Sequence, residues 1–219
     1  MVVSYADSDR AQELGERARQ FVDEQVIPVE REHLGEGPVS ESVIDDLRDA
    51  ARDYGVYCPQ IPEEYGGMGE DLRDVLPLFE AAGRSLLGPT AMRVAAPDEG
   101  NMHTLELVGT DAQKERWLEP LVDGQIDSGF AMTEPMQGAG SDPKMLQTTA
   151  ERDGDDWVLD GHKWWTTGGV DADLYLVMAR TDLDVHPYEG SSILLVPADT
   201  DGVEIVRDIT HMGQGLVPE

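Results

Sequence analysis

The first half of the chain carries apolar residues at helical spacing, in three separate stripes. The stripes are Leu14, Ala18, Phe21 and Val22, then Ile44, Leu47, Ala51 and Tyr54, then Leu72, Val75, Phe79, Ala82 and Leu86. Residues three or four apart lie on one face of an α-helix, so each stripe predicts an amphipathic helix. We expect Asp7 or Ser8 to cap the first helix, Pro28 to kink or end it, and Gly88-Pro89 to stop the third.

A fourth helical signal lies near residue 110. Thr110 and Gln113 have the spacing of a capping box, ahead of a short helix that carries Trp117 and Leu118. The segment 59–67, between the second and third predicted helices, is rich in proline and glycine, which is typical of a loop. The chain is therefore predicted to be helical up to about residue 126.

Beyond residue 126 the pattern changes to short runs of strand length. Residues 146–152 and 157–159 flank Asp153-Gly154, which predicts a β-hairpin. Further apolar runs cover 174–179, 193–196 and 203–206, and a strand is expected to begin near Asp127. The pattern predicts an α+β fold: a helical N-terminal domain (1–126) followed by a small antiparallel β-barrel or sandwich domain (127–219).

The composition is strongly acidic. The chain has 45 Asp and Glu against 16 Lys and Arg, a formal charge of −29, and only three of the basic residues are lysine. Acidic chains with few aromatics are often disordered, but 40% of these residues are hydrophobic and they recur periodically, which favours a folded protein with an acidic surface. Scarce lysine beside many carboxylates is expected of a halophilic protein, because high salt screens such charges.

Charge and cysteine content exclude several classes of function. A nucleic-acid backbone or an anionic membrane surface would be repelled. No apolar run is long enough to span a bilayer, and residues 1–10 show no secretory signal. The single cysteine, Cys58, cannot form an internal disulfide, which fits a cytoplasmic location.

Neither metal nor nucleophile chemistry is supported by residue spacing. The five histidines do not lie at metal-ligand spacing from one another or from the cysteine, so no metal site is predicted. Cys58 has no recognisable nucleophile context and is expected to be a buried apolar group. The carboxylates are too numerous for one acid–base pair to stand out, and no catalytic residue is predicted.

A glycine-bearing stretch at 138–143 has two interpretations. It begins like a dinucleotide-binding fingerprint, but Pro143 stands at the third glycine position and a hairpin follows where a helix should, so that interpretation fails. Its small residues and the Ser141 hydroxyl could still bind an anion. The alternative is an ordinary surface turn, which the spacing alone favours.

Two clusters combine bulky apolar groups with threonine hydroxyls. They are 130–135 (Phe-Ala-Met-Thr-Glu-Pro) and 163–169 (Lys-Trp-Trp-Thr-Thr-Gly-Gly). Together they could hold a flat amphipathic ring, with aromatic packing on its faces and donors at its polar edge. Trp164 and Trp165 are consecutive, so in a strand only one of them can face such a site. The alternative is that both are core residues and the threonines are simply good strand formers.

The same clusters carry a family resemblance. Residues 132–135, 140–142 and 160–168 resemble the middle domain of the acyl-CoA dehydrogenases, and residues 61–69 and 113–124 resemble parts of that family's helical N-terminal domain. Asn101-Met102, the tryptophan pair and residues 195–200 resemble the branch of members 10 and 11. The ordered set of motifs covers essentially the whole chain.

The resemblance implies an FAD-dependent oxidoreductase that desaturates an acyl-CoA thioester. In the family a carboxylate removes the α-proton while the flavin accepts the β-hydride. The residues that the resemblance assigns to cofactor binding are Phe130, Met132, Thr133, Gly140, Ser141, Trp165 and Thr167. Trp165 should pack on the flavin and Thr167 should hydrogen-bond near it. Gly140 and Ser141 should lie near the phosphates or near the pantetheine arm of the substrate.

The chain also departs from the family pattern. Met136-Gln137 look inserted, and the chain ends at Glu219, where family members would finish the β domain. The family's C-terminal helical bundle supplies the catalytic Glu and most of the oligomer interface, and Glu134 has no catalytic role in the family. We therefore expect an incomplete acyl-CoA dehydrogenase, inactive alone, which would form a homo-oligomer with the bundle supplied and pass electrons to an electron-transfer flavoprotein.

Two alternatives remain open at this point. One is an acyl-CoA oxidase or a flavin monooxygenase of the same fold, which would differ in how the reduced flavin treats oxygen. The other is a non-catalytic module that binds flavin, a CoA ester or a protein partner.

Overall fold

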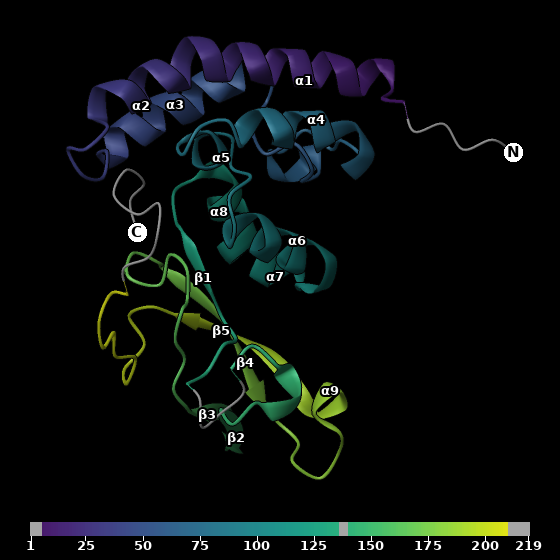
Figure 1. Ribbon diagram of the computed structural model, residues 1–219. Helices are drawn as coiled ribbons and strands as arrows, with labels where there is room; N and C mark the ends of the chain where they lie inside the picture. The colour runs from purple at the N-terminus through teal and green to yellow at the C-terminus, as the bar shows by residue number, and fades with distance from the viewer. Residues whose placement is uncertain (1–5, 136–139, 210–219) are drawn as a thin grey trace, which may run out of the picture. The chain divides into compact units, whose positions relative to one another are not determined.

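A computed structural model describes residues 6–135 and 140–209 of the 219-residue chain. The chain folds into two compact units: a helical unit that ends at Gln125, and a sheet unit from Ile126 to Ile209 (Figure 1). The predicted order of a helical region followed by a β region is therefore confirmed.

The helical unit is built from short α-helices interrupted by π and 3₁₀ turns. The elements are α1 (Asp9–Phe21), η1 (Val22–Val26), α2 (Ile27–His33), α3 (Glu41–Asp53), η2 (Glu63–Tyr65), α4 (Leu72–Ala82), α5 (Gly88–Ala91), α6 (Asp98–Val108), α7 (Asp111–Gln113), η3 (Lys114–Leu118) and α8 (Glu119–Asp123). Within the described ranges, no helix is long and apolar enough to cross a membrane.

The first helix starts as predicted but continues further. The Ser8 hydroxyl accepts a hydrogen bond from Ala11 N–H at 3.0 Å, which confirms Ser8 as the N-cap. Pro28 does not end the helix. The chain passes through the π turn η1 and continues as α2, where Pro28 occupies the first turn. The proline directly follows the π turn, where an Ile27 N–H to Val22 O bond already interrupts the regular α-helical hydrogen bonds.

The remaining helices confirm two predictions, correct one and include one helix that was not predicted. The second stripe forms α3, and the capping box of Thr110 and Gln113 is present with both of its reciprocal bonds. The third helix, α4, ends at Ala82 with Gly83 as its cap. Contrary to the prediction, Gly88-Pro89 does not end this helix but begins α5. The pattern also missed α6, whose buried positions include the polar Asn101. Polar core residues and a glycine in the first turn weaken the apolar stripe by which a helix is recognised.

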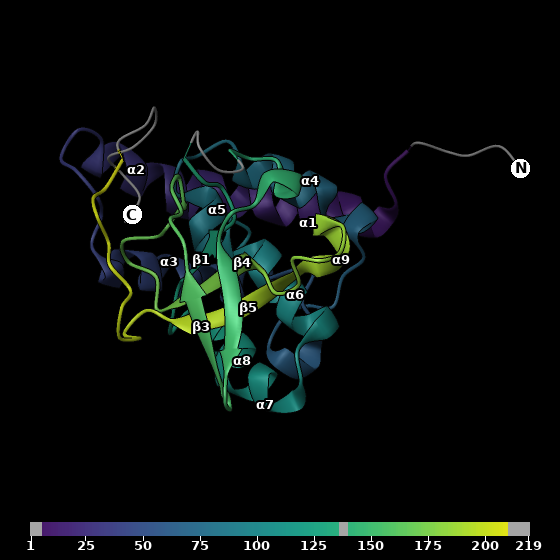
Figure 2. The same ribbon diagram turned by 90° about the horizontal axis from the view of Figure 1, so that it is seen from below.

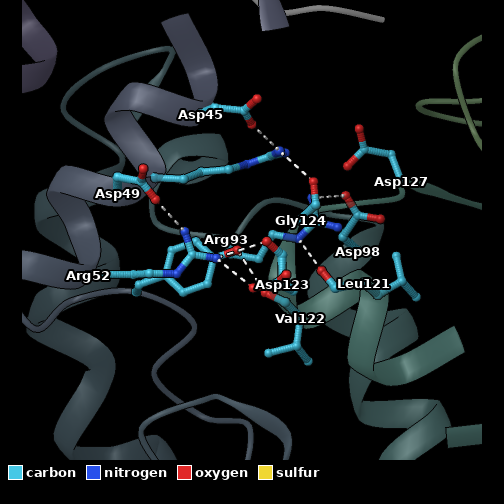
Figure 3. Close-up of polar contacts among 12 residues, drawn as sticks. Asp45, Asp49, Arg52, Arg93, Asp98, Leu121, Val122, Asp123, Gly124 and Asp127 are labelled. Atoms are coloured by element: carbon cyan, nitrogen blue, oxygen red, sulfur yellow. Dashed lines mark hydrogen bonds and ion pairs between the residues drawn. The ribbon is translucent and has the colours of Figure 1, made fainter. Parts of the chain in front are cut away.

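The C-terminus of α8 is held by side chains from other segments (Figure 3). The last carbonyls of a helix have no partner inside it. Here four consecutive carbonyl oxygens accept side-chain hydrogen bonds: Leu121 from Arg93 (2.9 Å), Val122 from Tyr57 (2.7 Å), Asp123 from Arg52 (2.8 Å) and Gly124 from Arg48 (3.0 Å). Three of the donors are cations, which the negative end of the helix dipole favours. This carbonyl cluster fixes the last turn of the helical unit.

The sheet unit contains one mixed five-stranded sheet, drawn from a second direction in Figure 2. The elements are β1 (Ser128–Ala131), η4 (Pro143–Met145), β2 (Thr149–Asp153), β3 (Asp156–Asp160), β4 (Leu174–Arg180), α9 (Pro187–Gly190) and β5 (Ser191–Pro197). β4 is the central strand: it pairs in parallel with β1 and β2 and antiparallel with β5. The predicted hairpin is confirmed as the antiparallel pair β2–β3.

Several β predictions are corrected by the structure. The sheet is mixed and not mostly antiparallel, because β1 runs parallel to β4, and it forms no clear barrel. Residues 203–206 are not a strand, although their apolar run has strand length. Residues 163–166 also lack regular structure and 167–170 form a turn, so strand alternation does not orient Trp164 and Trp165. A short apolar run becomes a strand only if a neighbouring strand is available for pairing.

Candidate functional site

Backbone and side-chain bonds bring the two sequence clusters together in the sheet unit. The N–H of Trp164 donates to the carbonyl oxygen of Thr133 at 3.0 Å. Lys163 Nζ donates to the carbonyl oxygen of Met132 at 3.0 Å. The segment that follows β1 and the segment that follows β3 therefore lie side by side, as a joint ring site requires.

Glu134 lies at the centre of this junction, a position for which the sequence indicated no catalytic role and predicted no structural one. The residue is 2% exposed, and its carboxylate accepts several hydrogen bonds. The donors include Gln147 N–H (2.8 Å), Thr148 N–H (2.9 Å), the Thr148 hydroxyl (2.5 Å) and Lys163 Nζ (2.9 Å). One signal could have revealed it. In a chain with three lysines, a lysine beside two tryptophans is a candidate for a specific partner.

The hydrogen bonds to Glu134 decide its charge. Burial by itself would raise the pKa of the carboxyl, but the bonds from Thr148, Lys163 and Gln147 outweigh burial and lower the pKa to about 2. Burial also lowers the pKa of Lys163, and the neighbouring carboxylate opposes that shift. Glu134 is thus an ionised, fully bonded anchor at neutral pH. A carboxylate with so low a pKa is a poor proton acceptor, so it is not a candidate for the general base.

The candidate contact groups beside this junction range from exposed to buried. Trp165 is 54% exposed and adopts a left-handed backbone conformation with φ of +56°. Thr167 is exposed and Thr133 half-buried, and within the described ranges neither hydroxyl makes a hydrogen bond. The buried indole N–H of Trp164 also has no partner among the described residues. An exposed indole beside threonine hydroxyls fits a flat ring with a polar edge, such as a flavin.

The other candidate residues are placed less closely together. Phe130 is half-buried on β1, opposite Leu176 of β4. The carbonyl oxygen of Gly140 accepts a hydrogen bond from Glu134 N–H at 2.9 Å, which ties this glycine to the junction. Ser141 is exposed, and in the described part of the chain no hydrogen bond joins it or Thr167 to the other candidates. The predicted insertion at 136–137 and the small residues 138–139 lie outside the described residues.

The remaining sequence candidates are structural. The thiol of Cys58 is buried, 1% exposed as a residue, and burial raises its pKa to about 12, so it is an apolar packing group as expected. Among the residues that the structure covers, no three His, Cys, Asp or Glu side chains group as metal ligands do. The sheet junction is thus the candidate site that the fold supports.

Sequence models of known protein families match both units of the chain. The model of the acyl-CoA dehydrogenase N-terminal domain matches residues 8–125, and the model of the acyl-CoA dehydrogenase middle domain matches residues 129–218.

Proteins with similar sequences include several acyl-CoA dehydrogenases. "Probable acyl-CoA dehydrogenase FadE2" of Mycobacterium tuberculosis is 37% identical, over 96% of this chain and 53% of its own length. Mouse acyl-CoA dehydrogenase family members 11 and 10 are 34% and 35% identical, over 95% and 94% of this chain and 28% and 20% of theirs. The chain thus spans about half the length of FadE2, and less of the mouse proteins.

Solved structures share the fold. "Structure of a putative acyl-CoA dehydrogenase from Mycobacterium abscessus" matches with a TM-score of 0.85 and 39% identity, over 96% of this chain and 55% of that one. A glutaryl-CoA dehydrogenase from Mycobacterium smegmatis, in complex with FADH2, matches with a TM-score of 0.71 and 26% identity, over 89% of this chain and 47% of that one.

Proposed function

Because the chain belongs to the acyl-CoA dehydrogenase family, we propose that it binds FAD and serves the α,β-desaturation of an acyl-CoA thioester. The resemblance to members 10 and 11 is confirmed, since both are among its relatives. The observation that carries the proposal is the junction of Thr133 with Trp164, which sets the exposed Trp165 beside a threonine whose hydroxyl has no hydrogen bond among the described residues. We also propose that the two units correspond to two domains, 1–126 and 127–219.

The candidate residues near the junction are assigned roles in binding the flavin ring. The Trp165 ring packs on the flavin face, and Phe130 and Met132 provide apolar contact. The hydroxyls of Thr133 and Thr167 donate to the polar edge of the ring, where such donors stabilise added negative charge. When bound, FAD supplies the acceptor for a hydride equivalent.

Gly140 and Ser141 are assigned to the anionic end of the ligands. Gly140 has a φ of +52°, and among the described residues no atom lies within 4 Å of a Cβ atom built on it. The exposed Ser141 hydroxyl and nearby backbone N–H groups would donate to the FAD phosphates or to the pantetheine arm of the thioester. The net charge of −29 repels such anions, so these local donors must carry the binding.

The role of the base is assigned to no residue of this chain. Removal of the α-proton requires a carboxylate of suitable pKa within reach of the substrate, and Glu134, which stands within the motif, is buried and fully bonded. An electron-transfer flavoprotein as acceptor, a homo-oligomer completed by further family sequence and a cytoplasmic location belong to the same proposal.

The proposal is tested by loading the purified chain with FAD and assaying acyl-CoA thioesters of several lengths with an artificial electron acceptor. We expect bound flavin without turnover. Turnover by these 219 residues would contradict the statement that they hold no base, and absence of bound flavin would contradict the assigned site.

A further inference from the structure

We propose that Lys163, Glu134 and Thr148 form a positioning device that sets the two flavin-facing segments in register and so holds Thr133 and Trp165 in place. This inference rests on the proposed flavin site, and it assigns to these three residues a role separate from contact with the ligand. Its basis is the pattern of bonds around Thr133.

Three consecutive residues after β1 are tied to two consecutive residues after β3. Met132 O binds Lys163 Nζ at 3.0 Å, Thr133 O binds Trp164 N–H at 3.0 Å, and the Glu134 carboxylate binds Lys163 Nζ at 2.9 Å. Lys163 therefore bonds on both sides of Thr133. A shift of either segment by one residue would break all three bonds at once, because each depends on the same register.

The device is anchored to the sheet through Thr148. Thr148 donates to Glu134 from both its N–H and its hydroxyl, at 2.9 and 2.5 Å, and its carbonyl oxygen accepts from Arg180 N–H at the end of β4, at 2.8 Å. Gly161 packs closely on Thr148, since a Cβ atom built on Gly161 would lie 2.2 Å from the Thr148 hydroxyl oxygen. The segment that carries Trp165 is thus fixed to the central strand by way of Thr148 and Glu134.

Burial makes the ion pair sensitive to loss of either partner. The side chains of Lys163 and Glu134 are 12% and 3% exposed, and a buried charge that loses its partner is strongly disfavoured. Trp165 also needs external support, since a bulky residue adopts a left-handed conformation only where its surroundings hold it there. Loss of the Lys163–Glu134 ion pair should therefore increase local opening of the segment around Trp165 more than it promotes unfolding of the sheet.

The test is amide hydrogen exchange of the chain without added flavin, in Lys163→Met and Glu134→Gln variants. The control is Lys144→Met, which removes an exposed lysine of the same unit. We expect the Trp164 amide to be accelerated at least about tenfold more than the amides of the β4–β5 ladder in both test variants, because local opening around Trp165 adds to any loss of overall stability. The control should match the native protein at both places. Equal acceleration of all amides, or no acceleration at Trp164, would overturn the inference.

A second readout connects the device to the ligand. FAD affinity should fall at least about tenfold in Lys163→Met and stay unchanged in Lys144→Met. Unchanged affinity in Lys163→Met would overturn the positioning of flavin contacts even if exchange at Trp164 is faster. If the native chain binds no FAD, the proposed function fails, and the exchange rates still decide whether the pair holds the two segments.

Discussion

The N–H of Trp164 lies 3.0 Å from the carbonyl oxygen of Thr133 and donates to it, although the two residues are far apart in sequence. This bond turns two clusters with weak individual signals into one surface. It also places the exposed Trp165 beside the half-buried Thr133. The candidate site therefore depends on the segments after β1 and after β3 lying side by side, and no single motif defines it.

The low pKa of Glu134 predicts a specific acid sensitivity of the sheet unit. Its pKa falls from 4.5 to about 2 on folding, so its charge stabilises the fold above pH 4.5, and this contribution is lost as the pH falls towards 2. Glu134→Gln should remove roughly 3 kcal/mol of stability near neutral pH and progressively less below pH 4.5.

Tryptophan fluorescence during urea unfolding at a series of pH values measures this difference, because three of the four tryptophans lie in the sheet unit. A stability gap between the native protein and Glu134→Gln that does not change from neutral pH to pH 2 would contradict the low pKa.

The carbonyl cluster of α8 predicts a large effect of one buried arginine. The Arg93 side chain is 2% exposed, pairs with Asp98 at 3.2 Å and donates to the Leu121 carbonyl. Arg93→Met leaves both groups without this partner, so the free energy of unfolding should fall by roughly 3–5 kcal/mol. Far-ultraviolet circular dichroism during urea unfolding reports this, since α1 to α8 all lie in the helical unit.

The matched control for Arg93 is Arg84→Met. Arg84 pairs with Asp23 at 2.7 Å, but both side chains are about half exposed, so its loss should leave the unfolding midpoint unchanged. Equal effects of the two substitutions would show that the α8 carbonyls do not depend on Arg93.

The charge of −29 predicts that stability depends on salt. Repulsion among surface carboxylates weakens as salt shortens the range of electrostatic forces, from about 10 Å at 0.1 M to about 3 Å at 1 M. The melting temperature should rise by roughly 5 °C or more between 0.1 and 2 M potassium chloride, which calorimetry measures. A melting temperature independent of salt, or an equal rise in sucrose without salt, would contradict the interpretation of the acidic surface as halophilic.

Sequence signals correctly predicted several features that depend only on residues close together in the chain. The Ser8 cap, the Thr110 capping box and the hairpin around Gly154 each depend on residues within a few positions, and the structure confirms all three. The continuation of helix through Pro28 could not be predicted, because it depends on a π turn that the apolar pattern does not show.

Features that depend on distant partners were not predictable. Glu134 is one of 45 acidic residues, and only the fold places Thr148 and Lys163 around it. The run at 203–206 has strand composition but does not pair, and the parallel partner of β1 is fixed only when β4 is placed beside it. Motif order across the whole chain predicted the family, because it does not require each short segment to be assigned correctly.

The measurement that tests the central claim most directly is a titration of the purified chain with FAD, followed by the induced visible circular dichroism of the flavin. Trp165→Ala is compared with Trp157→Ala, which removes a similarly exposed tryptophan of β3. We predict saturable binding by the native chain and by Trp157→Ala, and binding at least about tenfold weaker in Trp165→Ala, because only Trp165 packs on the ring. No saturable signal from the native chain, or equal binding by Trp165→Ala, would contradict the flavin site.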